Sequence, residues 1–251
     1  ALDPAVAAKP TWPSTWHNSN EFRSNYRHGG RDPANDPAYA RELRQAYTAC
    51  VSYVDAQVGR VLAELKKIDP DGNTIVVIWG DHGFSLGEHA IWGKHCLYEN
   101  ALRSPLLIRS PGLVQPGTAS AALVETVDIF PTLTALCGLP TPAQLDGHNL
   151  QPQLAQPTKP TAKPALAFWA NGQRTIRTDR WRLIASYNAA GEAQFELFDY
   201  VNDPMETSNH AAAHPEMVRE LLAQLARRPE LAWPSLRPTQ QALSPTATPE
   251  A

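Results

Sequence analysis

The sequence predicts an α/β domain followed by a smaller unit of an antiparallel sheet with one covering helix. A long helical pattern at residues 37–68 precedes an unbroken β-branched run at residues 74–79. A second apolar run and a second helical segment follow before residue 140. The order helix, strand, strand, helix favours an α/β sheet for this first part. Beyond a proline-rich stretch, four short apolar runs are separated by turn residues, which is typical of a meander of strands.

The first predicted element is the helix at residues 37–68. Asp36 is a suitable N-cap and Pro37 a suitable first helical residue. The helix is expected to end at residues 69–73, Asp-Pro-Asp-Gly-Asn, because these residue types favour turns. The apolar residues recur at steps of three or four: Leu43, Tyr47, Cys50, Val54, Val58, Val61, Leu65 and Ile68. The strand at 74–79 is expected to be buried on both faces, because its apolar run is continuous rather than alternating.

The next elements are a strand at residues 105–108 and a helix that begins near Asp128 and ends at Gly138. Residues 1–35 contain four prolines and no lasting periodicity, so an irregular segment is expected there. Six prolines between residues 140 and 164 predict a linker that runs along the surface. The predicted division is a first domain at 1–140, a linker at 141–164, a subdomain at 165–228 and a disordered tail at 229–251.

The predicted subdomain is an antiparallel meander covered by a helix. Turn residues such as Asn-Gly and Asn-Ala-Ala-Gly separate its strands, and Asp203-Pro204 turns the chain after the last of them. The four strands are expected at residues 166–169, 174–178, 181–186 and 195–198. Met217, Leu221, Leu222 and Leu225 then form one face of a helix that is expected to cover this sheet.

The charge balance and the hydropathy exclude two classes of partner. The chain has 251 residues, and its 22 basic and 25 acidic side chains give a formal charge of −3. A chain with this balance has no general attraction to nucleic acid or to an anionic membrane. No apolar run approaches the ~20 residues that a membrane-spanning helix needs. We therefore expect no nucleic-acid partner and no membrane span.

The three cysteines, Cys50, Cys96 and Cys137, are widely spaced and lie among apolar neighbours. This pattern is not that of a disulfide scaffold, and the absence of any CxxC motif argues against a cysteine zinc site. We expect each cysteine to be a buried free thiol that packs as a small hydrophobe.

The densest cluster of reactive side chains lies in residues 80–95, directly after the strand at 74–79. Ligands of open α/β sheets gather at the carboxyl ends of strands, so Asp81 and His82 stand where a site is expected. Gly80 and Gly83 flank them and let the backbone turn sharply. The alternative is a surface loop in which the acidic residues cap turns and the histidines bond to backbone carbonyls.

Residues 40–210 resemble the carboxyl-terminal portion of the type I sulfatases, of the alkaline phosphatase-like superfamily. An Asp-His pair, where many sulfatases have Asp-Asn, is closest to the iduronate-2-sulfatase-like branch. Four motifs carry the resemblance: residues 47–60 (YTACVSYVDAQVGR), residues 74–93 with Asp-His-Gly and Gly-Glu-His, residues 123–140 with VETVDIFPTL and Cys-Gly-Leu-Pro, and residues 195–209 with FELFD, Asp-Pro and ETSN. The resemblance implies part of an alkaline phosphatase-like sandwich of mixed sheet and helices.

The resemblance also implies roles for three side chains. Asp81 and His82 match late ligands of a divalent cation, calcium above other ions, although histidine is a less natural calcium ligand than asparagine. Lys94 matches the catalytic lysine that holds the sulfate and stabilises the charge on the departing ester oxygen. His89 and His95 are expected to be structural. Two further residues, Glu99 and Arg103, are expected to form an ion pair that holds the loop.

One part of the family pattern is missing from these residues. Sulfatases use a formylglycine made from the cysteine of Cys-x-Pro-x-Arg, and none of the three cysteines stands in that pattern. The early Asp-Asp metal ligands of the family are also absent. The chain begins at Ala1, and we expect it to be a carboxyl-terminal fragment whose missing N-terminal portion supplies the formylglycine and the other ligands.

The preferred function is therefore metal-assisted hydrolysis of a sulfate ester, with a sulfated sugar among the candidate substrates. By resemblance, the location is expected to be extracytoplasmic, that is periplasmic, secreted or lysosomal. One alternative is a zinc phosphodiesterase of the same superfamily, in which Asp81, His82 and another histidine bind zinc. A second alternative is a non-catalytic remnant that binds a sulfated glycan.

Overall fold

The structure, a computed structural model, describes residues 2–12, 29–113, 115–160, 163–169, 172–188 and 190–227. The expected disordered tail at 229–251 lies outside the described residues, as does the middle of the irregular segment at 1–35. The part of that segment that is described includes one helical turn, α1 (Pro4–Ala7).

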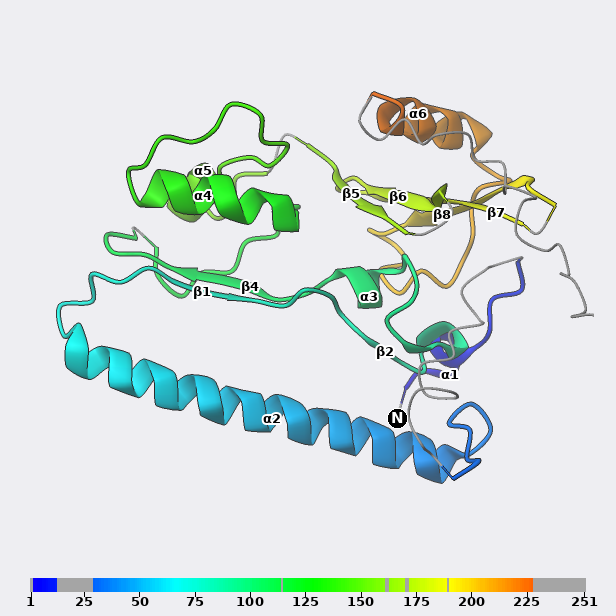
Figure 1. The fold of residues 1–251 in the computed structure, drawn as a ribbon. Helices are drawn as coiled ribbons and strands as arrows, with labels where there is room; N and C mark the ends of the chain where they lie inside the picture. The colour runs from blue at the N-terminus through cyan, green and yellow to red at the C-terminus, as the bar shows by residue number, and fades with distance from the viewer. Residues whose placement is uncertain are drawn as a thin grey trace, which may run out of the picture.

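The described residues form a mixed α/β fold, as predicted, with three antiparallel sheets of two, two and four strands (Figure 1). The long helix α2 runs along one side of the strands β1 and β4, and α4 and α5 lie on the other side. In chain order after α1 come α2 (Pro37–Ile68), β1 (Val76–Trp79), β2 (Ser85–Leu86), the 3-10 helix η3 (Glu88–Ala90), β3 (Trp92–Gly93), α3 (Glu99–Leu102), β4 (Leu106–Arg109), the 3-10 helix η4 (Thr126–Asp128), α4 (Ile129–Leu136), α5 (Gln151–Ala155), β5 (Ala165–Phe168), β6 (Arg174–Arg177), β7 (Trp181–Tyr187), β8 (Ala193–Asp199) and α6 (Pro215–Leu225).

Helix α2 begins and ends where the sequence predicts. Asp36 is its N-cap, with a carboxylate oxygen that accepts a hydrogen bond from the Tyr39 backbone N–H at 2.9 Å. Near its start, the helix contacts the loop after β1. Arg44 donates from Nε to the Leu86 carbonyl at 2.9 Å, and the ring of Tyr47 lies 5.5 Å from that of Phe84.

The rest of α2 exposes apolar side chains. In the described structure Val54 is 58% exposed, Val61 68% and Ile68 81%. Cys50 on this helix and Cys137 after α4 are exposed as well, so the prediction of buried thiols is right only for Cys96. Among the described residues no helix, α2 included, is both long and apolar enough to cross a membrane.

Strands β1 and β4 form a two-stranded antiparallel ribbon, in which Val76 is opposite Arg109 and Trp79 is opposite Leu106. The expected burial of β1 on both faces is wrong for the described structure: its first three side chains are half-buried, and Trp79 is 49% exposed. Within the described residues β1 pairs with β4 alone, whereas strands buried on both faces are typical of larger sheets.

The sheet formed by β5, β6, β7 and β8 is the predicted antiparallel meander, in sequence order. Its register aligns Leu166, Ile176, Leu183 and Leu197 in one row across the strands. Because alternate side chains of a strand share a face, this row defines one apolar face. Helix α6 packs on that face through Val218, Leu221 and Leu225. The predicted covering helix is therefore confirmed.

The opposite face of this sheet packs on the loop that joins β3 to α3. Ile184 of β7 and Phe198 of β8 belong to one buried cluster with Cys96, Leu97 and Tyr98 of that loop. Ile91, before β3, and Ala101, in α3, belong to the same cluster. Ala167 of β5 packs against the same cluster. The position of the loop is therefore fixed by side chains from a sheet that begins about seventy residues later in the chain.

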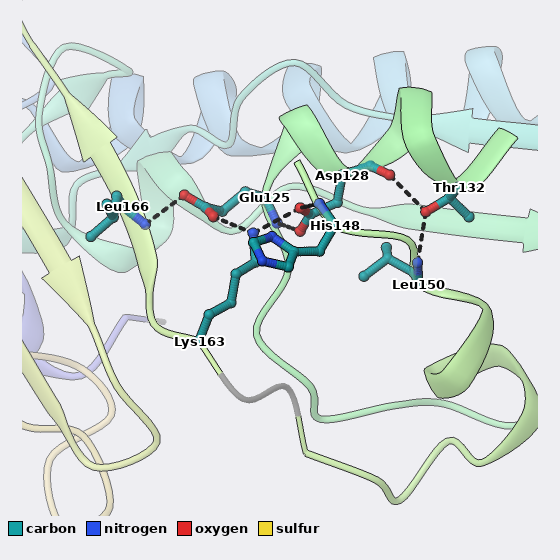
Figure 2. A network of polar contacts seen from close by, with 7 residues as sticks. All are labelled: Glu125, Asp128, Thr132, His148, Leu150, Lys163 and Leu166. Atoms are coloured by element: carbon teal, nitrogen blue, oxygen red, sulfur yellow. Dashed lines mark hydrogen bonds and ion pairs between the residues drawn. The ribbon is translucent and has the colours of Figure 1, made fainter. Parts of the chain in front are cut away.

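The proline-rich stretch at 141–164 is tied to the first part of the chain by the polar network of Figure 2. Lys163 Nζ lies 2.5 Å from Glu125 Oε2 and 2.7 Å from Asp128 Oδ1. The fully buried Asp128 also accepts from the His148 backbone N–H at 2.7 Å, and Thr132 Oγ1 accepts from the Leu150 N–H at 2.9 Å.

Gly147 approaches the start of α4 so closely that a Cβ there would collide with the Val127 carbonyl. These contacts hold the stretch at residues 147–150 and at Lys163, on either side of α5.

Candidate active site

Two backbone hydrogen bonds, at Gly80 and at Gly83, hold the loop after β1 in place. The Gly80 N–H donates to the Pro105 carbonyl at 2.9 Å, and the Gly83 N–H donates to the Ala101 carbonyl at 2.7 Å. A Cβ at Gly83 would collide with the Asn100 carbonyl oxygen, so glycine is required for this close approach. The two residues between the glycines, Asp81 and His82, are thereby presented on a fixed turn.

The ring of His82 is oriented by its own loop. Its Nδ1 lies 2.7 Å from the Gly83 carbonyl oxygen, which can only accept, so Nδ1 carries the proton in this contact. In the neutral form of the ring, the lone pair is on Nε2, which lies 3.8 Å from Asp81 Oδ2. A nitrogen lone pair and a carboxylate oxygen therefore stand side by side, and the Asp81 side chain is 77% exposed.

This donor pair fits part of a metal site. A carboxylate suits a hard divalent cation, and a histidine whose other nitrogen bonds to a backbone carbonyl has the arrangement that ligating histidines usually show. Within the described residues, no group of three or more His, Cys, Asp or Glu side chains could hold a metal ion. Asp81 and His82 can thus supply two ligands of a shell whose remaining ligands would have to come from elsewhere.

The next hairpin, β2 to β3, contains strained backbone. His89 and Ala90 have φ values of 52° and 58°, in the left-handed region that non-glycine residues rarely adopt. His89 is buried, and its ring stacks on that of Tyr98 with centroids 4.4 Å apart. The Tyr98 hydroxyl donates to the buried Glu196 of β8, which also accepts from Trp12 Nε1 at 2.7 Å.

Lys94 lies directly after β3, in a tight turn. The Cys96 N–H donates to the Lys94 carbonyl at 2.9 Å, which places His95 at the apex of a three-residue turn. Lys94 and His95 are half-buried, whereas Cys96 is buried. Burial raises the pKa of the Cys96 thiol to about 12, so it is protonated at neutral pH and cannot serve as the nucleophile.

Glu99, at the start of α3, is paired with the second sheet rather than with Arg103. Its carboxylate forms an ion pair with Arg182 of β7 and accepts from the Tyr200 hydroxyl at 3.2 Å. The expected Glu99–Arg103 pair is therefore wrong in its partner, because Glu99 points toward the sheet packed on α3.

Glu206 adds a second carboxylate to Glu99 and Arg182, and the three side chains form a buried polar cluster. Glu206 Oε1 lies 2.5 Å from Arg182 Nε, although the two atoms are not aligned as a hydrogen bond, and Glu206 Oε2 accepts from the Glu99 backbone N–H at 2.8 Å. Burial raises the pKa of Glu206, and Arg182 opposes that rise. No local pattern points to this cluster, because its members are separated by 83 and 107 residues.

Two family models match the chain. The model described as Sulfatase matches residues 10–139, and the model described as N-sulphoglucosamine sulphohydrolase, C-terminal, matches residues 87–230. Among curated proteins, a sulfatase of Formosa agariphila is 36% identical over 171 residues, which cover 68% of this chain and 33% of that protein. Iduronate 2-sulfatase of Homo sapiens is 34% identical over 145 residues, which cover 48% of this chain and 26% of that protein. The chain thus spans about a third or less of the length of these relatives.

Solved structures show the same similarity. A protein solved in complex with its substrate D-glucosamine-2-N,6-O-disulfate is 32% identical, with a TM-score of 0.64 over 72% of this chain and 39% of that one. A phosphonate monoester hydrolase from Silicibacter pomeroyi is 28% identical, with a TM-score of 0.65 over 76% of this chain and 41% of that one.

Proposed function

The chain belongs to the sulfatase family, and from this premise we propose that it supplies the cation-binding and sulfate-binding side of an enzyme that hydrolyses sulfate esters. The formylglycine nucleophile and the remaining cation ligands belong, in this proposal, to a segment outside these 251 residues. The observation that supports it most is the Asp81–His82 pair, in which the backbone orients Nε2 toward the carboxylate.

Each of the three residues has a separate task. Asp81 and His82 hold one divalent cation, for which calcium is the first choice because the other ligands would be carboxylate oxygens. When bound, the cation neutralises charge on a sulfate oxygen. Lys94 donates charge-assisted hydrogen bonds to the sulfate and stabilises the oxygen that departs with the alcohol. The packing of its loop against the sheet keeps Lys94 in place.

The proposed substrate is a sulfated sugar. The support is the similarity to a protein solved with D-glucosamine-2-N,6-O-disulfate and to iduronate 2-sulfatase. An extracytoplasmic location follows from the same relationship and is part of the proposal.

The 251-residue chain by itself is expected to show no turnover of an aryl sulfate, because a lysine and two metal ligands cannot replace a covalent nucleophile. The measurement is release of the phenol by the purified chain. The positive control is a protein in which a segment carrying Cys-x-Pro-x-Arg precedes this chain and in which the formylglycine has been made. Turnover by the chain alone that is lost in Lys94→Ala would contradict the proposal.

Asp81→Ala, made in the protein that also carries the nucleophile segment, is expected to weaken calcium binding at least tenfold and to remove activity. The folded state should be unchanged within about 0.5 kcal/mol, because the Asp81 side chain is exposed and makes no buried contact. Calcium titration calorimetry and thermal unfolding measure the two effects. Asp71→Ala, at an exposed aspartate in the turn after α2, is the matched control. Calcium affinity equal to that of wild type would remove Asp81 from the ligand set.

The second candidate is a zinc enzyme that acts on phosphate or phosphonate esters, and the similarity to a phosphonate monoester hydrolase favours it. Zinc prefers nitrogen ligands, so His82 would be the stronger of the two ligands. Elemental analysis of the protein that also carries the nucleophile segment separates the candidates. Stoichiometric zinc supports the second candidate, and stoichiometric calcium supports the first. A non-catalytic protein that binds sulfated glycans would bind such a sugar without turnover even when the nucleophile segment is present.

A further inference from the structure

An exposed aromatic side chain from the second sheet stands beside the loop of Lys94. Trp169 follows β5, and its indole ring lies 5.3 Å from the His95 ring, centroid to centroid, with the planes inclined by 41°. Trp169 is 37% exposed, so part of its ring faces solvent although it contacts His95. His95 is the residue next to Lys94.

The sheet fixes the position of Trp169. Its N–H donates to the Gln173 carbonyl at 2.8 Å, which extends the pairing of β5 and β6 beyond Phe168 and Arg174. Side chains two residues apart on a strand share a face, so Trp169 lies on the face of Ala167. Ala167 packs against the buried cluster that contains the Lys94 loop. The strand that carries the indole and the loop that carries Lys94 therefore pack on the same buried cluster.

The turn geometry also fixes His95 relative to Lys94. In an extended strand these neighbours would point to opposite faces, but the Cys96-to-Lys94 backbone bond folds the chain into a tight turn. Consecutive Cα atoms are about 3.8 Å apart, so the Lys94 backbone lies one residue from the side chain that the indole contacts.

We infer that Trp169, supported by His95, forms a stacking platform for the sugar ring whose sulfate Lys94 holds. This inference rests on the proposed function and adds a contact that selects the substrate class. A pyranose has apolar C–H faces and polar edges, which matches a partly exposed aromatic ring beside a cationic group. The ring contact does not involve the reacting bond, so it contributes to binding equally before and during the reaction.

The test uses the protein that carries the nucleophile segment as well as this chain, with D-glucosamine-2-N,6-O-disulfate as the substrate. Trp169→Ala is expected to raise KM about tenfold while kcat stays within about twofold, as expected for a contact that binds substrate and transition state alike. Trp169→Phe should keep most of the affinity. Inorganic sulfate, which has no ring, should inhibit wild type and Trp169→Ala with the same inhibition constant.

Val201→Ala is the matched control, because Val201 is an exposed apolar residue, 66% accessible, after β8 in the same sheet. An unchanged KM in Trp169→Ala overturns the inference, and so does an equal weakening of the sugar and of inorganic sulfate. A wild-type protein that hydrolyses aryl sulfates but no sulfated monosaccharide also overturns it. A wild-type protein that hydrolyses neither substrate overturns the proposed function itself, so the two failures are distinct.

Discussion

Lys94→Ala is expected to lower kcat for a sulfate ester by about 10²- to 10³-fold in the protein that carries the nucleophile segment, which is the usual cost of removing one donor that stabilises developing charge. The lysine stands in a turn closed by the Cys96 N–H, next to a buried cluster that holds the loop. The alanine variant should therefore fold normally while it loses the ammonium group. Initial rates with an aryl sulfate, together with thermal unfolding, give both quantities.

Two further variants test whether the loss of kcat is specific to the ammonium group of Lys94. Lys94→Arg keeps the positive charge but not the compact shape of an ammonium group, so it should recover only part of the rate. Lys159→Ala, at an exposed lysine in the proline-rich stretch, removes the same charge elsewhere and should leave kcat unchanged. A Lys94→Ala protein that keeps more than half of the wild-type kcat would show that Lys94 does not hold the sulfate.

Arg182→Met is expected to have the largest effect on stability, a loss of about 3–5 kcal/mol, because it leaves two carboxylates without their cation. The Arg182 side chain is 3% exposed, and its partners Glu99 and Glu206 are 18% and 1% exposed. Methionine fills a similar volume, so the loss would report the missing charge rather than a cavity. Chemical denaturation of the chain measures the free energy of unfolding.

The loss should depend on pH. Burial already raises the pKa of Glu206, and removing Arg182 takes away the group that opposes this rise. A carboxyl group whose pKa is higher in the folded than in the unfolded protein destabilises the fold as the pH rises above the unfolded value. Arg182→Met should therefore be destabilised more at about pH 8 than at about pH 5. The double variant Arg182→Met, Glu206→Gln should regain part of the loss and lose most of this dependence.

Lys67→Met is the control for this experiment. Lys67 also pairs with a carboxylate, Glu64, at 2.6 Å, but the two side chains are 68% and 71% exposed. Exposed pairs contribute ~1 kcal/mol or less, so this variant should be nearly as stable as wild type. Equal effects of the Arg182 and Lys67 substitutions would mean that the buried cluster contributes no more than a surface pair.

Patterns that depend on neighbouring residues were predictable from the sequence. The spacing of apolar side chains predicted α2 to its ends, because Asp36-Pro37 and Asp69 supply the local capping and turn chemistry. The meander followed from alternation and turn residues, since each of its strands pairs with the next one along the chain. The Asp81–His82 pair could be located for the same reason, because both residues follow one strand.

Features that depend on distant residues were not predictable. The continuous apolar run of β1 indicates burial on both faces, yet Trp79 is half exposed because that burial requires partners that the pattern does not identify. Glu99 has a nearby arginine, Arg103, so the sequence favoured a local pair. The true partner, Arg182, is set by the way the second sheet packs on α3.

The dependence of the Lys94 loop on the second sheet has a consequence for the order of folding. Each hairpin of the meander closes a short loop and can form as soon as it leaves the ribosome. The loop at 91–101 cannot, because Tyr98 and Glu99 find their partners Glu196 and Arg182 only 98 and 83 residues later. Closing such long loops is slow, and domains are synthesised from the N-terminus. The loop at 91–101 is therefore translated before the strands that hold it and becomes ordered only after β7 and β8 have formed.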